Sequence, residues 1–122
     1  MLFWIFAALI LHAVYVFTPT MLFFPTEGLG RHMAGRDDLP EPSKVTARAL
    51  RALANWQESL PVFIALALLA VVLEADATLG AAIFVLARVA YLPLYMVAIP
   101  GLRTVAWVVA VVGLVMMALA LV

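Results

Sequence analysis

The chain of 122 residues lacks cysteine and has few charged residues, which make up 11% of the sequence. Soluble domains carry about 25% charged residues, so this chain has too little polar surface to cover a soluble fold of its size. The missing cysteine excludes a thiolate nucleophile, a cysteine-ligated metal and a structural disulfide. The net charge is zero, so the chain lacks the excess of basic residues that is typical of nucleic-acid-binding proteins. We expect neither a metal site nor a nucleic-acid partner.

Apolar residues, in contrast, make up 68% of the chain, which predicts an integral membrane protein in contact with membrane lipids. A membrane-spanning helix needs about 20 mostly apolar residues. Four segments meet this requirement: Leu2 to Phe24, Leu60 to Leu73 with a polar helical extension back to about Lys44, Ala77 to Ile99, and Leu102 to Val122. These runs are too long and unbroken for barrel strands. The sequence therefore predicts a single all-α domain, residues 1–122, built as a bundle of four transmembrane helices.

The first apolar segment is predicted to be a retained helix. A cleaved signal peptide would begin with positive charge and end at a small-residue cleavage site, whereas residues 1–6 are uncharged and the apolar run continues past Val16. Pro19 and Pro25 are expected to kink or end this helix, because proline removes a backbone donor. Ser43 is the expected N-cap of the second helix.

Basic residues are distributed unequally between the loops. The segment from Glu27 to Arg51 contains Arg31, Arg36, Lys44, Arg48 and Arg51. The turn after the second helix contains two acidic residues and no basic one, and Arg103 is placed in the turn before the fourth helix. By the positive-inside rule, the first loop and the Arg103 turn face the cytoplasm, and both termini face outward.

A stripe of polar residues begins the second helix. Arg48, Arg51, Asn55 and Glu58 are spaced by three, four and three residues, which places them on one side of a helix. Ionisable groups at membrane depth cost at least about 2.5 kcal/mol each on insertion scales, so they usually pair inside a bundle. Two interpretations remain open: a structural network in which Arg51 and Glu58 compensate each other, or a polar ligand site.

A second polar face lies on the third helix, where Arg88, Tyr91 and Tyr95 follow a helical spacing. Arg88 is near the middle of the span, too deep to snorkel easily, and requires a partner. Glu58, the one acidic residue inside the apolar spans, is the expected partner. The tyrosines alternatively form an interfacial aromatic belt, and Arg103 is alternatively a snorkelling anchor.

Three ordered blocks of the sequence resemble the MAPEG family, the membrane-associated proteins in eicosanoid and glutathione metabolism, in its bacterial form. The first block, residues 48–63, has an arginine, an asparagine four residues later and a glutamate three residues further on. The second, residues 87–95, has an Ala-Arg pair followed by two tyrosines. The third, residues 101–103, ends in the arginine that opens the fourth helix.

The resemblance implies a homotrimer in a bacterial inner membrane, with sites between subunits that open toward the cytoplasm. Members of the family bind glutathione and conjugate, reduce or isomerise lipophilic small-molecule substrates. Carried over by position, the residues expected to bind glutathione are Arg51, Asn55, Glu58, Arg88, Tyr91, Tyr95 and, as a weaker candidate on the same stripe, Arg48. Arg103 is the expected catalytic residue, which activates the thiol. Four first-loop candidates, namely Arg31, His32, Arg36 and Asp38, have no aligned role.

The chemistry of these residue types agrees with the implied ligand. Guanidinium groups pair with the two carboxylates of glutathione in bidentate fashion. Glu58 is suited to the ammonium group, and Asn55 to an amide. A free thiol has a pKa of about 8.5, and a cation within reach lowers such a pKa by roughly 1–3 units. Arg103 would supply this charge at the lipid boundary, and glutathione would supply the sulfur.

Three functional classes remain open at this point. The first is a glutathione-dependent transferase or peroxidase that acts on lipophilic electrophiles. The second is a non-catalytic membrane protein whose polar network holds the trimer together. The third is a small transporter in which Glu58 couples an ion. Trp4, Trp56 and Trp107 are either interfacial anchors or walls of the site.

Overall fold

The computed structural model of the chain describes residues 1–35, 37 and 40–122, except the side chains of Thr26 and His32. Four helices occur in this part of the chain: α1 (Leu2–Met33), α2 (Lys44–Val72), α3 (Thr78–Met96) and α4 (Pro100–Leu119). Each contains a segment long and apolar enough to cross a membrane. The prediction of an all-α bundle with four transmembrane helices is therefore confirmed.

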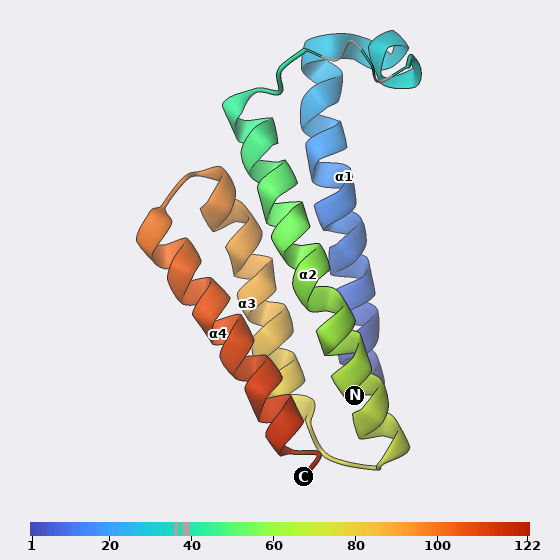
Figure 1. Ribbon diagram of the computed structural model, residues 1–122, viewed down its shortest axis with the longest axis vertical. Helices are drawn as coiled ribbons and strands as arrows, with labels where there is room; N and C mark the ends of the chain where they lie inside the picture. Colours follow the sequence, from blue (N-terminus) through green and yellow to red (C-terminus); the bar gives the residue numbers. More distant parts are fainter. Residues whose placement is uncertain (36, 38–39) are drawn as a thin grey trace.

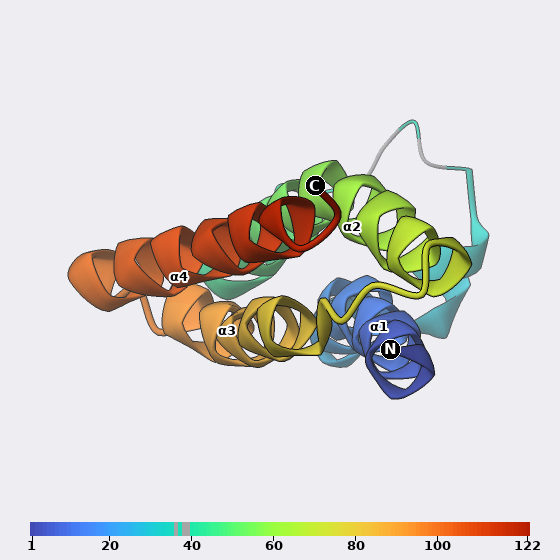
Figure 2. The same ribbon diagram turned by 90° about the horizontal axis from the view of Figure 1, so that it is seen from below.

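The helices form a two-by-two bundle. Figure 1 shows α1 running beside α2 and α3 beside α4, and Figure 2 shows the same pairs from below. One end of the bundle carries the end of α1, the start of α2 and the α3–α4 turn, and we call it the first-loop end (Figure 1). The opposite end carries the α2–α3 turn and both chain termini. The polar blocks on α2, α3 and α4 thus meet at the same end.

Helix α1 is longer than expected, because it continues through Pro19 and Pro25 to Met33. The apolar membrane span nevertheless ends at Pro25, as expected, and the residues after it continue the helix past a kink. Its one residue with non-helical dihedral angles is Gly28, at φ 75° and ψ 167°. The hydroxyl of Thr18 donates to the Val14 carbonyl at 2.7 Å, just before the first proline. Such side-chain donors help membrane helices tolerate proline.

Helix α2 begins where the sequence predicts it. The Ser43 hydroxyl accepts a hydrogen bond from the backbone N–H of Thr46 at 3.2 Å and caps the helix. The 29 residues of α2 make it about 43 Å long at 1.5 Å per residue. An apolar membrane core is about 30 Å thick. The first turns of α2 therefore extend beyond the core at the first-loop end.

Two turns close without glycine. Glu74 follows α2 and Ala98 follows α3, and both take positive φ, at 54° and 59°. Each ends its helix in a Schellman-type turn, in which a backbone N–H bonds back to a carbonyl five residues earlier. In the first turn, Asp76 accepts hydrogen bonds from the Thr78 side chain and backbone N–H, which hold the pKa of its carboxyl below the usual value.

The core between α1, α2 and α3 is a stack of aromatic rings. Tyr15 stacks on Trp56 at 5.0 Å between ring centroids, Trp56 on Phe84 at 5.8 Å, and Phe84 on Phe63 at 4.7 Å. The Trp56 side chain is fully buried, and its indole N–H donates to Nδ1 of His12 at 3.0 Å. Trp56 is therefore a core residue that fixes α1 to α2, not an interfacial anchor.

Helices α3 and α4 approach each other more closely than side chains normally permit. A Cβ atom added to Gly80 would lie 2.7 Å from the Gly113 carbonyl oxygen, and one added to Gly113 would lie 2.7 Å from the Gly80 carbonyl oxygen. The two backbones are in direct contact there, as small residues allow in membrane proteins. This contact sets the spacing of the helix pair that carries most of the candidate site.

Candidate functional site

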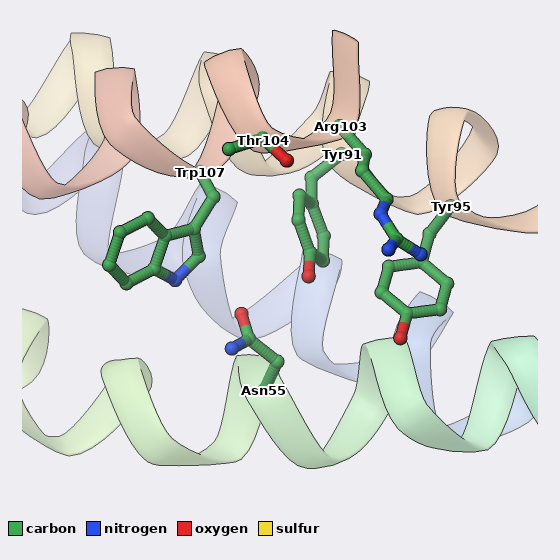
Figure 3. Close-up of a pocket in the computed structure, with 6 residues that line it drawn as sticks. All are labelled: Asn55, Tyr91, Tyr95, Arg103, Thr104 and Trp107. Atoms are coloured by element: carbon green, nitrogen blue, oxygen red, sulfur yellow. The ribbon is translucent and has the colours of Figure 1, made fainter. Parts of the chain in front are cut away.

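A pocket of about 260 Å³ lies between α2, α3 and α4 near the first-loop end. Figure 3 shows its wall, which consists of Asn55, Tyr91, Tyr95, Arg103, Thr104 and Trp107. The first four are predicted site residues, and they come from all three sequence blocks. The fold thus brings residues that are up to 52 positions apart in the sequence to one cavity.

Arg103 lies in the first turn of α4, which begins at Pro100, earlier than expected. Its guanidinium carbon lies 4.7 Å from the centre of the Tyr95 ring, a cation–π contact that orients the side chain. Figure 3 shows the two side chains together at one end of the pocket. Arg103 makes no ion pair or side-chain hydrogen bond with any residue that the structure describes. Its five donors are therefore available to a ligand.

Arg88 is buried behind the pocket, with 1% of its surface exposed. One terminal nitrogen donates to the Asn55 amide oxygen at 2.6 Å and the other to the Ser59 hydroxyl at 2.9 Å. The guanidinium also lies 5.1 Å from the centre of the Tyr91 ring. The prediction that Glu58 pairs with Arg88 was wrong, because Glu58 projects from the exposed side of α2. The buried cation is paired with neutral oxygens instead.

This network orients Asn55 toward the pocket. Its amide oxygen is occupied by Arg88, so its NH₂ group remains as a donor for a ligand. Tyr91 and Tyr95 lie beside it with ring centroids 5.5 Å apart, and neither hydroxyl bonds to a described residue. Tyr91 is only 5% exposed, so it belongs to the bundle interior and not to an aromatic belt.

The polar residues of α2 differ in their surroundings: some contact α3, and others are exposed. Arg48 is partly buried and donates to the Met96 carbonyl at 3.2 Å, at the end of α3. Arg51 and Glu58 are exposed, and neither makes an ion pair or hydrogen bond with a residue in the described parts of the chain. The structural interpretation, in which these two charges compensate each other, does not hold within the described chain, because two helical turns separate them by about 10 Å along the axis. Both side chains are exposed in the isolated chain.

Sequence reasoning missed several residues that shape the site. The Tyr15 hydroxyl donates to the Arg88 carbonyl at 2.8 Å and ties α1 to the site. Ser59 lies four residues after Asn55, so extending the helical spacing would have found it. His12 and Tyr15 are polar residues three apart in an apolar span, which is a similar signal. Trp107 was not missed: the sequence indicates either an interfacial anchor or a wall of the site, and Trp107 lines the pocket one turn after Arg103.

The first-loop candidates lie elsewhere. Arg31 forms an exposed ion pair with Glu27 at 2.7 Å within α1. Arg36, Asp38 and the side chain of His32 lie outside the described residues. Within the described residues, no group of three histidine, aspartate or glutamate side chains is placed to hold a metal ion.

Four apolar helices with a polar pocket at one end define a multi-pass α-helical membrane protein. The model of the MAPEG family matches residues 1–122. The chain therefore belongs to the MAPEG family. No curated protein and no solved structure matches it.

Proposed function

We propose that the protein is a glutathione-dependent membrane transferase or peroxidase that acts on lipophilic electrophiles. The observation that carries this proposal is the pocket in which Arg103, free of any described acidic partner, shares a cavity with Asn55 and two tyrosines. The exposed side chains of Arg51 and Glu58 add unpaired charges of both signs nearby on α2. This donor set fits a ligand with two carboxylates, one ammonium, amides and an acidic thiol.

Each side chain has a distinct proposed task. Arg51 binds a carboxylate, with Arg48 beside it, and Glu58 accepts the ammonium. The Asn55 NH₂ group and the hydroxyls of Tyr91 and Tyr95 bind amide or carboxylate oxygens. Arg88 acts through Asn55, which it holds in place.

Arg103 is the proposed catalytic residue. Bound glutathione supplies the thiol, which is nucleophilic as the thiolate. The Arg103 guanidinium stabilises negative charge at the thiol position and lowers the thiol pKa. Its place in the first turn of α4, at the boundary of the apolar core, suits a lipophilic electrophile that arrives from the bilayer.

The size of the pocket and the exposure of the α2 charges support a homotrimer with sites between subunits, which is part of the proposal. Small-molecule sites usually enclose about 300–1,000 Å³, more than this pocket provides. Arg51 and Glu58 face outward, so a ligand that reaches them leaves this cavity and lies against the neighbouring copy. The first-loop end, which carries most of the basic residues, faces the cytoplasm of a bacterial inner membrane in this proposal.

Thiolate formation tests the role of Arg103. Ultraviolet difference absorbance, recorded as the pH is raised with bound glutathione, should give a thiol pKa roughly 1–3 units below the free value in the unaltered protein. Arg103→Ala should return the pKa close to the free value and spare most of the affinity, while Arg103→Lys should keep part of the shift. The same pKa in the unaltered protein and in Arg103→Ala would remove Arg103 from the mechanism.

One observation favours a second candidate, a non-catalytic member whose polar network holds the trimer. Both terminal nitrogens of Arg88 already donate within the chain, to Asn55 and Ser59, as a structural network requires. Such a protein would use Arg51 and Glu58 to pair with the adjacent copy and would bind no thiol.

A further inference from the structure

Trp107 is the large apolar residue of the pocket wall. It lies one helical turn after Arg103 on the same face of α4, and its side chain is 41% exposed. Its indole N–H donates to no described residue. Figure 3 shows the indole ring at the opposite end of the pocket from Arg103, with its nitrogen on the side that faces Asn55. The wall thus offers an open aromatic surface and an unused donor together.

The volume of the pocket limits what lies against this ring. A dry cavity of about 150 Å³ holds benzene, so a cavity of about 260 Å³ has room for one substituted ring. The depth of Trp107 along α4 also limits the chemistry of the ligand. Trp107 is seven residues into α4, which places it about 10 Å below the start of the helix. The Trp107 end of the pocket is therefore the deeper, more apolar end.

The chemistry of the Trp107 end distinguishes between lipophilic groups. An alkyl chain would gain only buried area there. A flat ring would also gain offset stacking on the indole, and an acceptor such as a nitro or carbonyl oxygen would satisfy the indole N–H. Because this donor bonds to no described residue and has no proposed role toward glutathione, such an acceptor adds selectivity that an apolar wall alone does not provide.

We infer that Trp107 is the residue that selects the second substrate, and that it favours aromatic or conjugated electrophiles carrying a hydrogen-bond acceptor. The ring stacks on Trp107, and the reacting carbon points toward the Arg103 end. This inference rests on the proposed glutathione-dependent function, since it names the substrate class for the same pocket.

Binding of two thioethers tests the inference without turnover. S-(p-nitrobenzyl)glutathione carries an aromatic ring with an acceptor, and S-hexylglutathione carries an alkyl chain. Their dissociation constants and that of glutathione are measured on the purified full-length protein and on Trp107→Leu, Trp107→Phe and a control, Trp4→Leu. Trp4 contacts Phe3 near the start of α1, far from the pocket in sequence and on another helix.

In Trp107→Leu, affinity for the nitrobenzyl thioether should fall about 3- to 10-fold, the size of an aromatic pair contribution. Affinity for the hexyl thioether and for glutathione should be unchanged. Trp107→Phe, which keeps a ring and loses the donor, should give an intermediate loss, and Trp4→Leu none. Unchanged glutathione affinity also shows that each variant is folded.

Equal losses for both thioethers in Trp107→Leu would overturn the inference, since Trp107 would then be a non-selective apolar wall. No loss for either would overturn it too, and would make Trp107 an interfacial anchor. Both results leave the proposed function intact as long as glutathione binds. If the unaltered protein binds neither glutathione nor a thioether, the proposed function and this inference fail together.

Discussion

At the scale of single residues, the central feature is a buried arginine held by neutral partners. Arg88 lies near the middle of α3, where an unpaired cation would be very unfavourable. Its planar guanidinium reaches Asn55 and Ser59 at once, which a lysine ammonium on a single stem does not reproduce. The same bonds fix the rotamer of Asn55 at the wall of the pocket. Stability and site geometry therefore depend on the same side chain.

Replacing Arg88 with lysine should destabilise the protein by about 1–3 kcal/mol, because at least one buried polar partner is left unsatisfied. The thermal unfolding temperature in detergent measures this effect. Arg31→Lys is the matched control, since Arg31 forms an exposed pair with Glu27 and such pairs are worth less than about 1 kcal/mol. Equal unfolding temperatures for Arg88→Lys and the unaltered protein would show that the network carries no stability.

The sequence predicted correctly which residues share one side of a helix. It predicted the wrong partner for Arg88. Helical spacing identified Asn55, Tyr91 and Tyr95, and the family resemblance identified Arg103; these four residues do line one cavity. It assigned Glu58 to Arg88 on charge alone. Whether two side chains meet depends on the rotation of one helix against another, and a single sequence does not contain that angle. A search for opposite charges does not find neutral hydrogen-bond partners such as Ser59.

At the scale of helices, the contact between Gly80 and Gly113 holds together the helix pair that carries most of the candidate site. It brings α3 and α4 together at the backbone. Tyr91 and Tyr95 lie on one of these helices, and Arg103 and Trp107 lie on the other. Gly80 is eleven residues before Tyr91, about 16 Å along α3, so the contact joins the two helices near the end opposite the pocket.

Gly113→Ala should destabilise the protein by roughly 1–3 kcal/mol, as overpacking does in closely packed cores. The added methyl would lie 2.7 Å from the Gly80 oxygen and from the Phe84 nitrogen, both backbone atoms that cannot move aside independently. Gly101→Ala is the control within the same helix, because nothing lies within 4 Å of its Cβ position. It should be neutral or stabilising by up to about 1 kcal/mol. Thermal unfolding of both variants checks this, and similar effects would contradict the close contact.

Helix positions were largely predictable and helix ends less so. Composition located all four spans, and Ser43 marked the start of α2 correctly. The first span ends at Pro25, one residue from the predicted end, but the helical continuation to Met33 past the kink at Gly28 was not predicted. The ends of α2 and α3 lack the usual glycine signal, since Glu74 and Ala98 adopt the left-handed conformation instead.

At the scale of the whole molecule, the charges on the outer face of α2 require an explanation. Glu58 lies fourteen residues before Val72, which is about 21 Å along the helix and within the thickness of an apolar core. Its exposed carboxylate would therefore face lipid in an isolated chain, at a cost of at least about 2.5 kcal/mol. A neighbouring copy with a shared ligand would remove that cost.

Glu58→Ala should leave the trimer intact and weaken glutathione binding by about 10-fold or more, the loss typical of a hydrogen bond to a charged group. Light scattering in mild detergent measures the assembly, and equilibrium dialysis measures the affinity. Glu74→Ala is the control, because Glu74 is an exposed acid at the opposite end of the bundle. Dissociation of the trimer with no thiol binding would favour the non-catalytic candidate instead.

The central claim is tested most directly by calorimetric titration of the purified protein with glutathione, beside Arg51→Ala and the control Arg31→Ala. We predict saturable binding that is lost in Arg51→Ala and retained in Arg31→Ala. Arg51 is exposed and unpaired among the described residues, so its removal should cost binding and not folding. A folded protein that fails to bind glutathione, or binds it equally well in Arg51→Ala, would contradict the proposed site.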